Sequence, residues 1–272
     1  MAISQQEKGE RFRALHAREG MFVIPNPYDG ATAKLLASMG FEALTTTSAG
    51  LAFVLGRPDG GVTREQSLWN ARLIVEAVDL PVAADLENGY GHRPEDAAEC
   101  IRKAASIGVV GGSIEDFSGD EGRPIYDFSH AVERVAAAVE AAHALPFPFT
   151  FVARAENHIH GVDDLDDTIR RLQAYEQAGA DVLFAPGLPS LEAIRTVCGA
   201  VKKPVNYVNS GPKFTLGELK AAGVRRVSVG GLFSRVALTA VKRAAEEMLA
   251  TGTFAFGEGV LSTSEVNDVM RR

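Results

Sequence analysis

The feature that most constrains the fold of this chain is a repeated alternation of short apolar runs with longer amphipathic stretches. Eight runs are candidate strands, at 22–26, 43–48, 81–87, 111–116, 149–156, 181–186, 204–208 and 226–230. Stretches with helical periodicity follow them, at 30–39, 63–78, 94–107, 129–144, 163–178, 190–201, 215–222 and 233–250. Continuously apolar strands joined by helical crossovers favour parallel pairing, and about eight such units predict a closed (β/α)8 TIM barrel.

An open, doubly wound α/β sheet is the alternative fold. Such a sheet usually carries a glycine-rich phosphate turn after its first strand, and the PNPYDG segment at this place lacks one. No linker or low-complexity segment divides the chain, so residues 1–250 are predicted to form a single barrel domain. The segment 251–272 holds surplus apolar residues after the barrel is complete. We expect it to pack on the barrel or on a partner subunit.

Composition limits the cellular locations and the classes of binding partner that we expect for the chain. The 272 residues carry a net charge of −7, which argues against a nucleic-acid surface or a basic membrane patch. The N-terminus has no apolar core typical of a signal peptide, and no run approaches the ~18 apolar residues of a membrane span. The two cysteines, Cys100 and Cys198, fall in predicted helices, so a disulfide framework is not supported. We therefore expect a cytoplasmic protein.

Three acidic residues close two neighbouring candidate strands. Asp85 and Glu87 lie in PVAADLENGYG, and Glu115 lies in GGSIED. Alternation along a strand places the first two on one face, and the strand ends of a barrel meet at one mouth. Clustered carboxylates repel unless something positive lies between them, and Mg²⁺ or Mn²⁺ prefers such oxygen ligands. These three residues are the predicted metal ligands, although some of them could instead cap loops or pair with arginines.

Groups that suit an anionic substrate occupy other strand ends. Arg154 closes the fifth run and could grip a carboxylate bidentately, or form a structural ion pair with Glu156 or Glu115. A hydroxyl and small-residue amides follow the second run, at Ser48, Ala49 and Gly50. Two further asparagines near the end of the seventh run, Asn206 and Asn209, are polar, and we include Asn209 among the substrate-binding candidates.

Two loops carry further candidates. The GRPDGG loop at 56–61 could be a mobile lid that brings Asp59 to the substrate, or a plain surface turn. His158 and His160 would form a zinc site with Glu156 if the fifth strand continued past Asn157. If it ends there, an active-site hydrogen bond from His158 or Asn157 is the better interpretation.

The motifs TTSAG, GRPDGG, PVAADLENGYG, GGSIED, ARAEN, YEQAGADVLFAPG and GVRRVSVGG, taken in order, resemble the isocitrate lyase / phosphoenolpyruvate mutase superfamily. The resemblance runs from about residue 22 to residue 250. It implies a (β/α)8 barrel with Mg²⁺ or Mn²⁺ near Asp85, Glu87 and Glu115. It also implies a 2-oxo acid or related carboxylate held by Arg154 and by the segment of Ser48, Ala49 and Gly50. Members are usually tetramers built from dimers that exchange a C-terminal helix, which would account for the apolar tail.

The chain departs from the family pattern in one loop. Lyases of the family carry a K-[KR]-C-G-H loop after I-E-D, and its cysteine serves as the acid. This chain has FSGDEGRPIYDFS there, so it is a divergent member without that acid. The phosphonate branch carries lysine and asparagine in the loop and a histidine after the sixth strand, where this chain has Ala185–Gly187. Both the cysteine-dependent lyase reaction and phosphonopyruvate chemistry are therefore disfavoured.

What remains is the shared metal-and-enolate chemistry. Loss of CO₂ needs no acid for the leaving group, so the first hypothesis is decarboxylation of a small 2-oxo di- or tricarboxylate. The second is carbon–carbon cleavage of a 2-hydroxy diacid of the methylisocitrate type, with Tyr90, Glu156 or His158 as the acid. The third is a catalytically silent protein that binds 2-oxo acids. A homo-oligomer, dimer or tetramer, is expected in each case.

Overall fold

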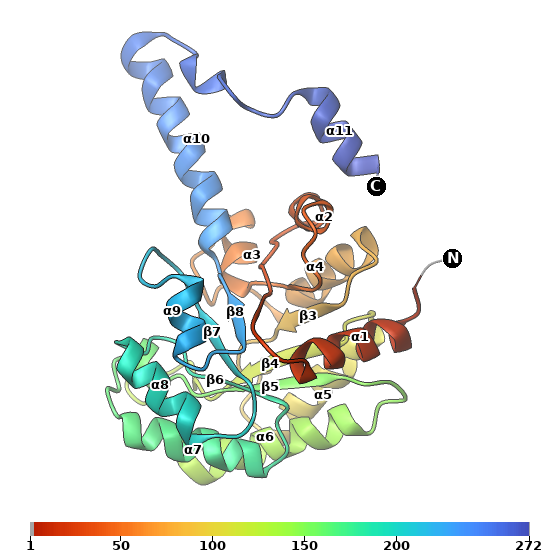
Figure 1. Ribbon diagram of the computed structural model, residues 1–272, viewed down its shortest axis with the longest axis vertical. Coiled ribbons are helices and arrows are strands. Elements are labelled where there is room, and N and C mark those ends of the chain that lie inside the picture. The colour runs from red at the N-terminus through yellow and green to blue at the C-terminus, as the bar shows by residue number, and fades with distance from the viewer. Residues whose placement is uncertain (1–2, 272) are drawn as a thin grey trace.

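The computed structural model describes residues 3–271 of the chain. Eight parallel strands form one sheet in the order β1-β8-β7-β6-β5-β4-β3-β2. They are β1 Phe22–Val23, β2 Leu44–Thr45, β3 Val82–Asp85, β4 Gly111–Glu115, β5 Thr150–Arg154, β6 Val182–Phe184, β7 Val205–Val208 and β8 Arg226–Ser228. The segment that follows β1 meets β2 through a 3.1 Å hydrogen bond from the Thr45 amide to the Pro25 carbonyl. The sheet thus curls on itself as a TIM barrel with helices outside it, which confirms the predicted fold (Figure 1).

The helices begin largely where the sequence predicts. They are α1 Gln5–Ala17, α2 Gly30–Ser38, α3 Ser48–Val54, α4 Arg64–Ala77, α5 Pro94–Ser106, α6 Phe128–His143, α7 Leu165–Gln177, α8 Leu191–Ala200, α9 Leu216–Ala221, α10 Leu232–Thr251 and α11 Thr263–Arg271, with 3-10 turns at His158–His160 and Ala255–Gly257. Thr63 and Gln66 form the predicted capping box at the start of α4. Helices α1 and α3 were not predicted.

Every strand is shorter than the run that predicts it, and in β3 and β5 the difference changes the site. β3 ends at Asp85, and Glu87 has a positive φ of 46° in the turn that follows. The predicted placement of Asp85 and Glu87 on one face of a single strand is therefore wrong. β5 ends at Arg154, and His158–His160 form a 3-10 turn. The alternation that a zinc site would need is likewise absent, because the chain leaves β5 after Arg154 and forms this turn.

Helix α1 covers the N-terminal end of the barrel. Phe12 is fully buried and joins Phe22, Ile24 and Val110 in a small core cluster. A Cβ at Gly111, the first residue of β4, would lie 2.6 Å from Cε1 of Phe12, so only glycine fits there. The helix is otherwise polar, because only this narrow face meets the barrel.

The C-terminal segment extends beyond the barrel. Helix α10 projects away from the strands, and α11 returns toward α2 (Figure 1). Lys34 of α2 donates a 2.5 Å hydrogen bond to the Met270 carbonyl of α11, which connects the two helices. Large apolar side chains are exposed along this arm at Val236, Leu238, Val241, Met248, Leu249, Phe254, Phe256, Val260 and Leu261. None of the helices within residues 3–271 has the length and apolar content needed to span a bilayer.

Candidate active site

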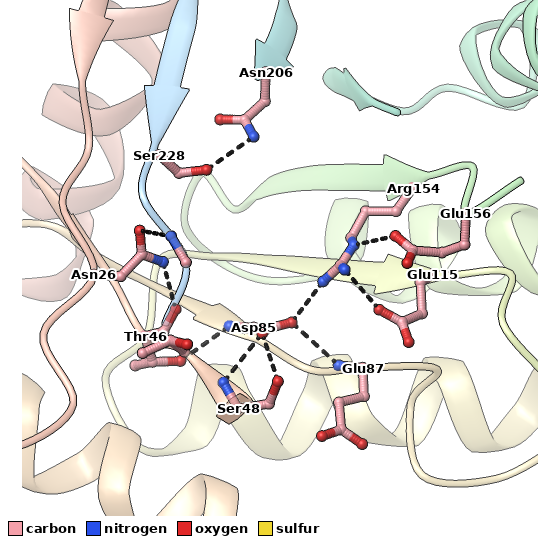
Figure 2. A network of polar contacts seen from close by, with 12 residues as sticks. Asn26, Thr46, Ser48, Asp85, Glu87, Glu115, Arg154, Glu156, Asn206 and Ser228 are labelled. Atoms are coloured by element: carbon pink, nitrogen blue, oxygen red, sulfur yellow. Dashed lines mark hydrogen bonds and ion pairs between the residues drawn. The ribbon is translucent and has the colours of Figure 1, made fainter. Parts of the chain in front are cut away.

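The C-terminal mouth of the barrel is organised around one arginine. Arg154 donates from Nη1 to Asp85 at 2.8 Å, from Nη2 to Glu115 at 3.0 Å and from Nε to Glu156 at 2.9 Å. The three acids come from β3, from β4 and from the residues that follow β5 (Figure 2). The pairing of β4 with β5 places Glu115 directly opposite Arg154. The ring of Phe184 lies 5.0 Å from the guanidinium carbon and covers one of its faces.

This arrangement supplies the positive charge that the sequence argument assigned to a metal ion. Within residues 3–271, no group of three or more histidine, cysteine, aspartate or glutamate side chains has the geometry of a preformed metal site. The alternative reading, an ion pair of Arg154 with Glu115 and Glu156, is what the structure shows. It does not complete the charge balance, however, because three carboxyl groups surround one guanidinium.

The excess of acidic groups over basic groups shifts the pKa values within the cluster. Burial raises the pKa of Glu115 well above its usual range. The charge of Arg154 lowers this pKa, and repulsion from Glu156 and Asp85 raises it further. Burial alone would lower the pKa of Arg154, but the three carboxylates raise it well above its ordinary value. The mouth can therefore accept further positive charge close to these acids.

Glu87 contributes to the site in an unexpected way. Its backbone N–H lies 3.5 Å from Oδ1 of Asp85, while its carboxylate points away from Arg154 (Figure 2). Oε1 of Glu87 is buried without a hydrogen-bond partner. Burial, followed by repulsion from Asp85 and Asp59, raises the pKa of Glu87 to about 7. Glu87 and Tyr90 are the two non-glycine residues with positive φ in the described chain, and such strain is typical of functional sites.

The predicted anion-binding turn is the start of α3. Ser48 donates from its amide at 3.1 Å and from its hydroxyl at 2.9 Å to Oδ2 of Asp85. The amide of Gly50 donates to the Thr47 hydroxyl at 3.2 Å, which caps the helix. A Cβ at Gly50 would meet Cγ2 of Thr47 at 2.5 Å, so the turn requires glycine. The turn thus orients Asp85, and Ala49 faces the open site.

A cavity of about 420 Å³ opens over this cluster. Five of the predicted site residues line it: Ser48, Ala49, Asp59, Asp85 and Arg154. Asp59 reaches it from the 56–61 loop, and burial raises the pKa of its carboxyl. Seven others are not in its lining: Gly50, Glu87, Tyr90, Glu115, Asn157, His158 and Asn209. Of these, Glu115 contacts Arg154 directly, while His158 faces Asp163 with 3.4 Å between Nδ1 and Oδ1.

A buried network that the sequence did not reveal holds the cluster in place. Asp116 accepts hydrogen bonds from the Glu156 amide at 2.8 Å, from Tyr175 at 2.6 Å and from Arg171 at 3.2 Å. It therefore fixes the turn that carries Glu156 beside Arg154. The Phe117 and His160 rings stack at 3.8 Å and link the loops that follow β4 and β5.

The cavity continues into a polar lumen. Its inward-facing residues include Thr45, Ser113, Asn206, Arg226 and Ser228, where many barrels carry branched apolar side chains. Nδ2 of Asn206 donates to Ser228 at 3.1 Å (Figure 2). The signal in the sequence was the placement of asparagine, arginine and serine inside otherwise apolar strands.

Fold and site together define a (β/α)8-barrel enzyme with an acidic, arginine-centred mouth. The phosphoenolpyruvate phosphomutase family matches residues 12–249. The chain is 30% identical over 258 residues to 2-methylisocitrate lyase of Escherichia coli strain K12, covering 90% of this chain and 84% of that one. It therefore belongs to the isocitrate lyase / phosphoenolpyruvate mutase superfamily, as the motifs predicted, and is an enzyme of the carbon–carbon lyase type.

Two solved structures place the fold in the same group. A candidate lyase/mutase from Burkholderia cenocepacia J2315 is 54% identical, with a TM-score of 0.95 over 97% of this chain and 95% of that one. A phosphonopyruvate hydrolase in complex with oxalate and Mg²⁺ has a TM-score of 0.87 at 22% identity, over 99% of this chain and 95% of that one. At that identity, the second likeness concerns the fold.

Proposed function

We propose that this protein is a Mg²⁺- or Mn²⁺-dependent lyase that breaks the outer carbon–carbon bond at C3 of a small 2-oxo di- or tricarboxylate, leaving the enolate of the 2-oxo group. The observation that carries the proposal is the Arg154 cluster, in which three carboxyl groups face one guanidinium, beneath a cavity of about 420 Å³. Such a mouth binds a cation and a carboxylate together, which is what a chelating 2-oxo acid requires.

The chain's own residues can hold the substrate carboxylate. A guanidinium has five N–H donors, and the three ion pairs of Arg154 leave one donor on each Nη. These two donors suit a bidentate carboxylate, and Phe184 restricts the plane in which it binds. Ser48 holds Asp85 through two hydrogen bonds, so the acid keeps its position when the substrate enters.

The donor set fits a hard divalent cation. Asp85 lines the cavity, and the unpartnered Oε1 of Glu87 offers a second carboxylate oxygen nearby, directly or through water. Glu115 is the third candidate ligand and would balance its charge between the cation and Arg154. When bound, the cation would act as a Lewis acid and stabilise the charge that develops on the 2-oxo oxygen.

The lining of the cavity favours decarboxylation among the possible reactions. Within the described residues, no cysteine, histidine, lysine or tyrosine lines it. A departing CO₂ forms directly from a carboxylate, and water can protonate the enolate that remains, whereas a carbonyl compound departs from a 2-hydroxy acid only if a group removes the hydroxyl proton. The second candidate is cleavage of a branched 2-hydroxy diacid, which the similarity to 2-methylisocitrate lyase favours. It would need Tyr90, Glu156 or His158 to reach the substrate as the acid.

The test is a panel of 2-oxo and 2-hydroxy diacids incubated with Mg²⁺ or Mn²⁺, with separate detection of CO₂, pyruvate and glyoxylate. We expect metal-dependent CO₂ release, and chelator treatment should abolish it. Release of glyoxylate or pyruvate without CO₂ would favour the second candidate.

Asp85→Ala should lower turnover by roughly a hundredfold or more, because the variant removes a carboxylate at the reacting end. Asp166→Ala, on the exposed surface of α7, is the control and should behave as wild type. Calorimetry that detects no uptake of either metal, with or without oxalate, would refute the proposal.

A further inference from the structure

The floor of the active-site cavity contains a buried arginine without a counter-ion. Arg226 begins β8, is 4% exposed and lines the cavity of about 420 Å³. Its Nε has no hydrogen-bond partner, and none of the ion pairs among residues 3–271 includes it. Its polar contact is with Nε2 of His16, at 3.5 Å, and burial lowers the pKa of the guanidinium to about 9.

The other buried arginines are compensated within the chain. Arg154 has three carboxylates, and Arg171 pairs with Asp116 and Asp167. Arg134 instead donates to backbone carbonyls, those of Asn88, Gly91 and Arg93. A buried charge without such partners is costly. The cost of Arg226 is offset if its counter-ion arrives with the substrate.

Strand register connects Arg226 to the reacting end of the site. Arg154 pairs with Phe184, Phe184 with Asn206, and Asn206 with Arg226, across four neighbouring strands. All four line one cavity, so the lumen has an arginine at each end of this row. Between them, Oδ1 of Asn206 also lacks a partner, and Nδ2 of Asn206 contacts Ser228 on the side of the site away from Asp85 (Figure 2).

We propose that Arg226 binds the distal anionic group of the substrate and selects 2-oxo acids that carry a second carboxylate. This inference rests on the proposed function and specifies its substrate class. Arg154 holds the carboxylate next to the 2-oxo group, and Arg226 neutralises a distal carboxylate, which in a decarboxylation is not the carboxylate that leaves as CO₂. An acid of the same length without the distal carboxylate would leave Arg226 unpaired and would bind more weakly.

The test compares matched probes by calorimetry in the presence of Mn²⁺. Oxaloacetate, 2-oxoglutarate and 2-oxoadipate are each measured against 2-oxobutanoate, 2-oxopentanoate and 2-oxohexanoate. In the wild type, at least one diacid should bind roughly tenfold or more tightly than its monoacid. In Arg226→Met this preference should fall to about threefold or less, while monoacid affinity changes by less than about threefold.

A matched control and a stability measurement separate recognition from a structural role. Arg225 is adjacent but donates to the carbonyls of Gly20 and Arg18 outside the lumen, so Arg225→Met should keep the preference. Ligand-free Arg226→Met should melt at or above the wild-type temperature, because the variant removes an uncompensated buried charge.

The outcomes distinguish this inference from the proposed function. A diacid preference that persists in Arg226→Met would overturn the inference. Equal affinity of the wild type for diacids and monoacids would also overturn it. So would an Arg226→Met variant that melts several degrees lower than the wild type and also has a reduced affinity for monoacids. If no 2-oxo acid bound to the wild type with Mn²⁺, the proposed function itself would fail.

Discussion

At the scale of single residues, the dominant feature of the site is an imbalance between acidic and basic side chains. One guanidinium meets three carboxylates at the barrel mouth, and another lies below it with none. Neither arrangement is electrically balanced by the protein. A divalent cation at the first and a substrate anion at the second would restore the balance. Ligand binding and stability should therefore be coupled strongly in this enzyme.

Asp167 offers a test of how the supporting network depends on pH. Burial alone would raise the pKa of this carboxyl, but hydrogen bonds from Arg171, Arg170 and Asn157 lower it to about 2. Because the folded-state pKa lies below the unfolded value of 3.8, the stabilisation is complete above pH 3.8 and is lost as the pH falls toward 2. The carboxylate is partly exposed, so we expect about 1 kcal/mol after solvent screening.

The measurement is the free energy of unfolding in urea for wild type and Asp167→Asn between pH 6 and pH 2.5. The difference between them should be constant down to about pH 4 and then shrink. Asp166→Asn, one residue earlier on the exposed surface, should show little difference at any pH. A difference that grows as the pH falls would contradict the assignment.

At the scale of elements, α1 covers the N-terminal end of the barrel, and its contact depends on the packing of the Phe12 ring against Gly111. Phe12 packs on Gly111 and lies edge-on to His16, with ring centroids 4.7 Å apart. Phe12 and His16 also lie beside the guanidinium of Arg226, whose carbon is 6.0 Å from the Phe12 ring and whose Nη1 is 3.5 Å from Nε2 of His16. The helix thus forms the floor on which the distal end of the cavity rests.

Phe12→Ala should destabilise the protein by about 3–5 kcal/mol, because a fully buried ring leaves a cavity that the rigid barrel cannot close. Arg11→Ala on the exposed side of the same helix should change stability by about 0.5 kcal/mol or less. Urea unfolding of both variants gives the comparison. Equal effects of the two substitutions would mean that α1 does not seal the barrel.

At the scale of the whole molecule, the arm formed by α10, the following segment and α11 leaves apolar surface uncovered. Val241 is 67% exposed and Leu249 is 89% exposed, and both lie on α10. Contiguous exposed apolar side chains of this kind mark interaction sites, and a second copy of the chain is the simplest partner. We therefore propose a homo-oligomer, dimer or tetramer, in which the arm packs on a neighbouring subunit.

Light scattering after size-exclusion chromatography tests this proposal. The wild type should have a mass two or four times the 29.0 kDa of the chain. The double variant Val241→Glu, Leu249→Glu should shift toward smaller species, because buried carboxylates oppose association. Arg243→Glu, on an exposed polar position of the same helix, should keep the wild-type mass. A monomeric wild type would disprove the proposal.

The sequence by itself determined the barrel, because hydrophobic periodicity and helix caps are local properties that each segment carries. It also located the acids and Arg154 at strand ends, since parallel strands bring their C-terminal ends to one mouth. It did not foresee that Glu87 leaves the strand, because the left-handed turn after Asp85 gives no periodic signal.

Only the tertiary structure decided which charges meet. Asp85 and Arg154 are 69 residues apart, and Arg226 and His16 are 210 apart. The pattern of the chain shows where a charged side chain starts, but not which of several opposite charges it reaches. That choice depends on the curvature of the closed sheet and on the helix that covers its floor. These features place the guanidinium of Arg154 among three acids and that of Arg226 in the lumen without an acidic partner in the described chain.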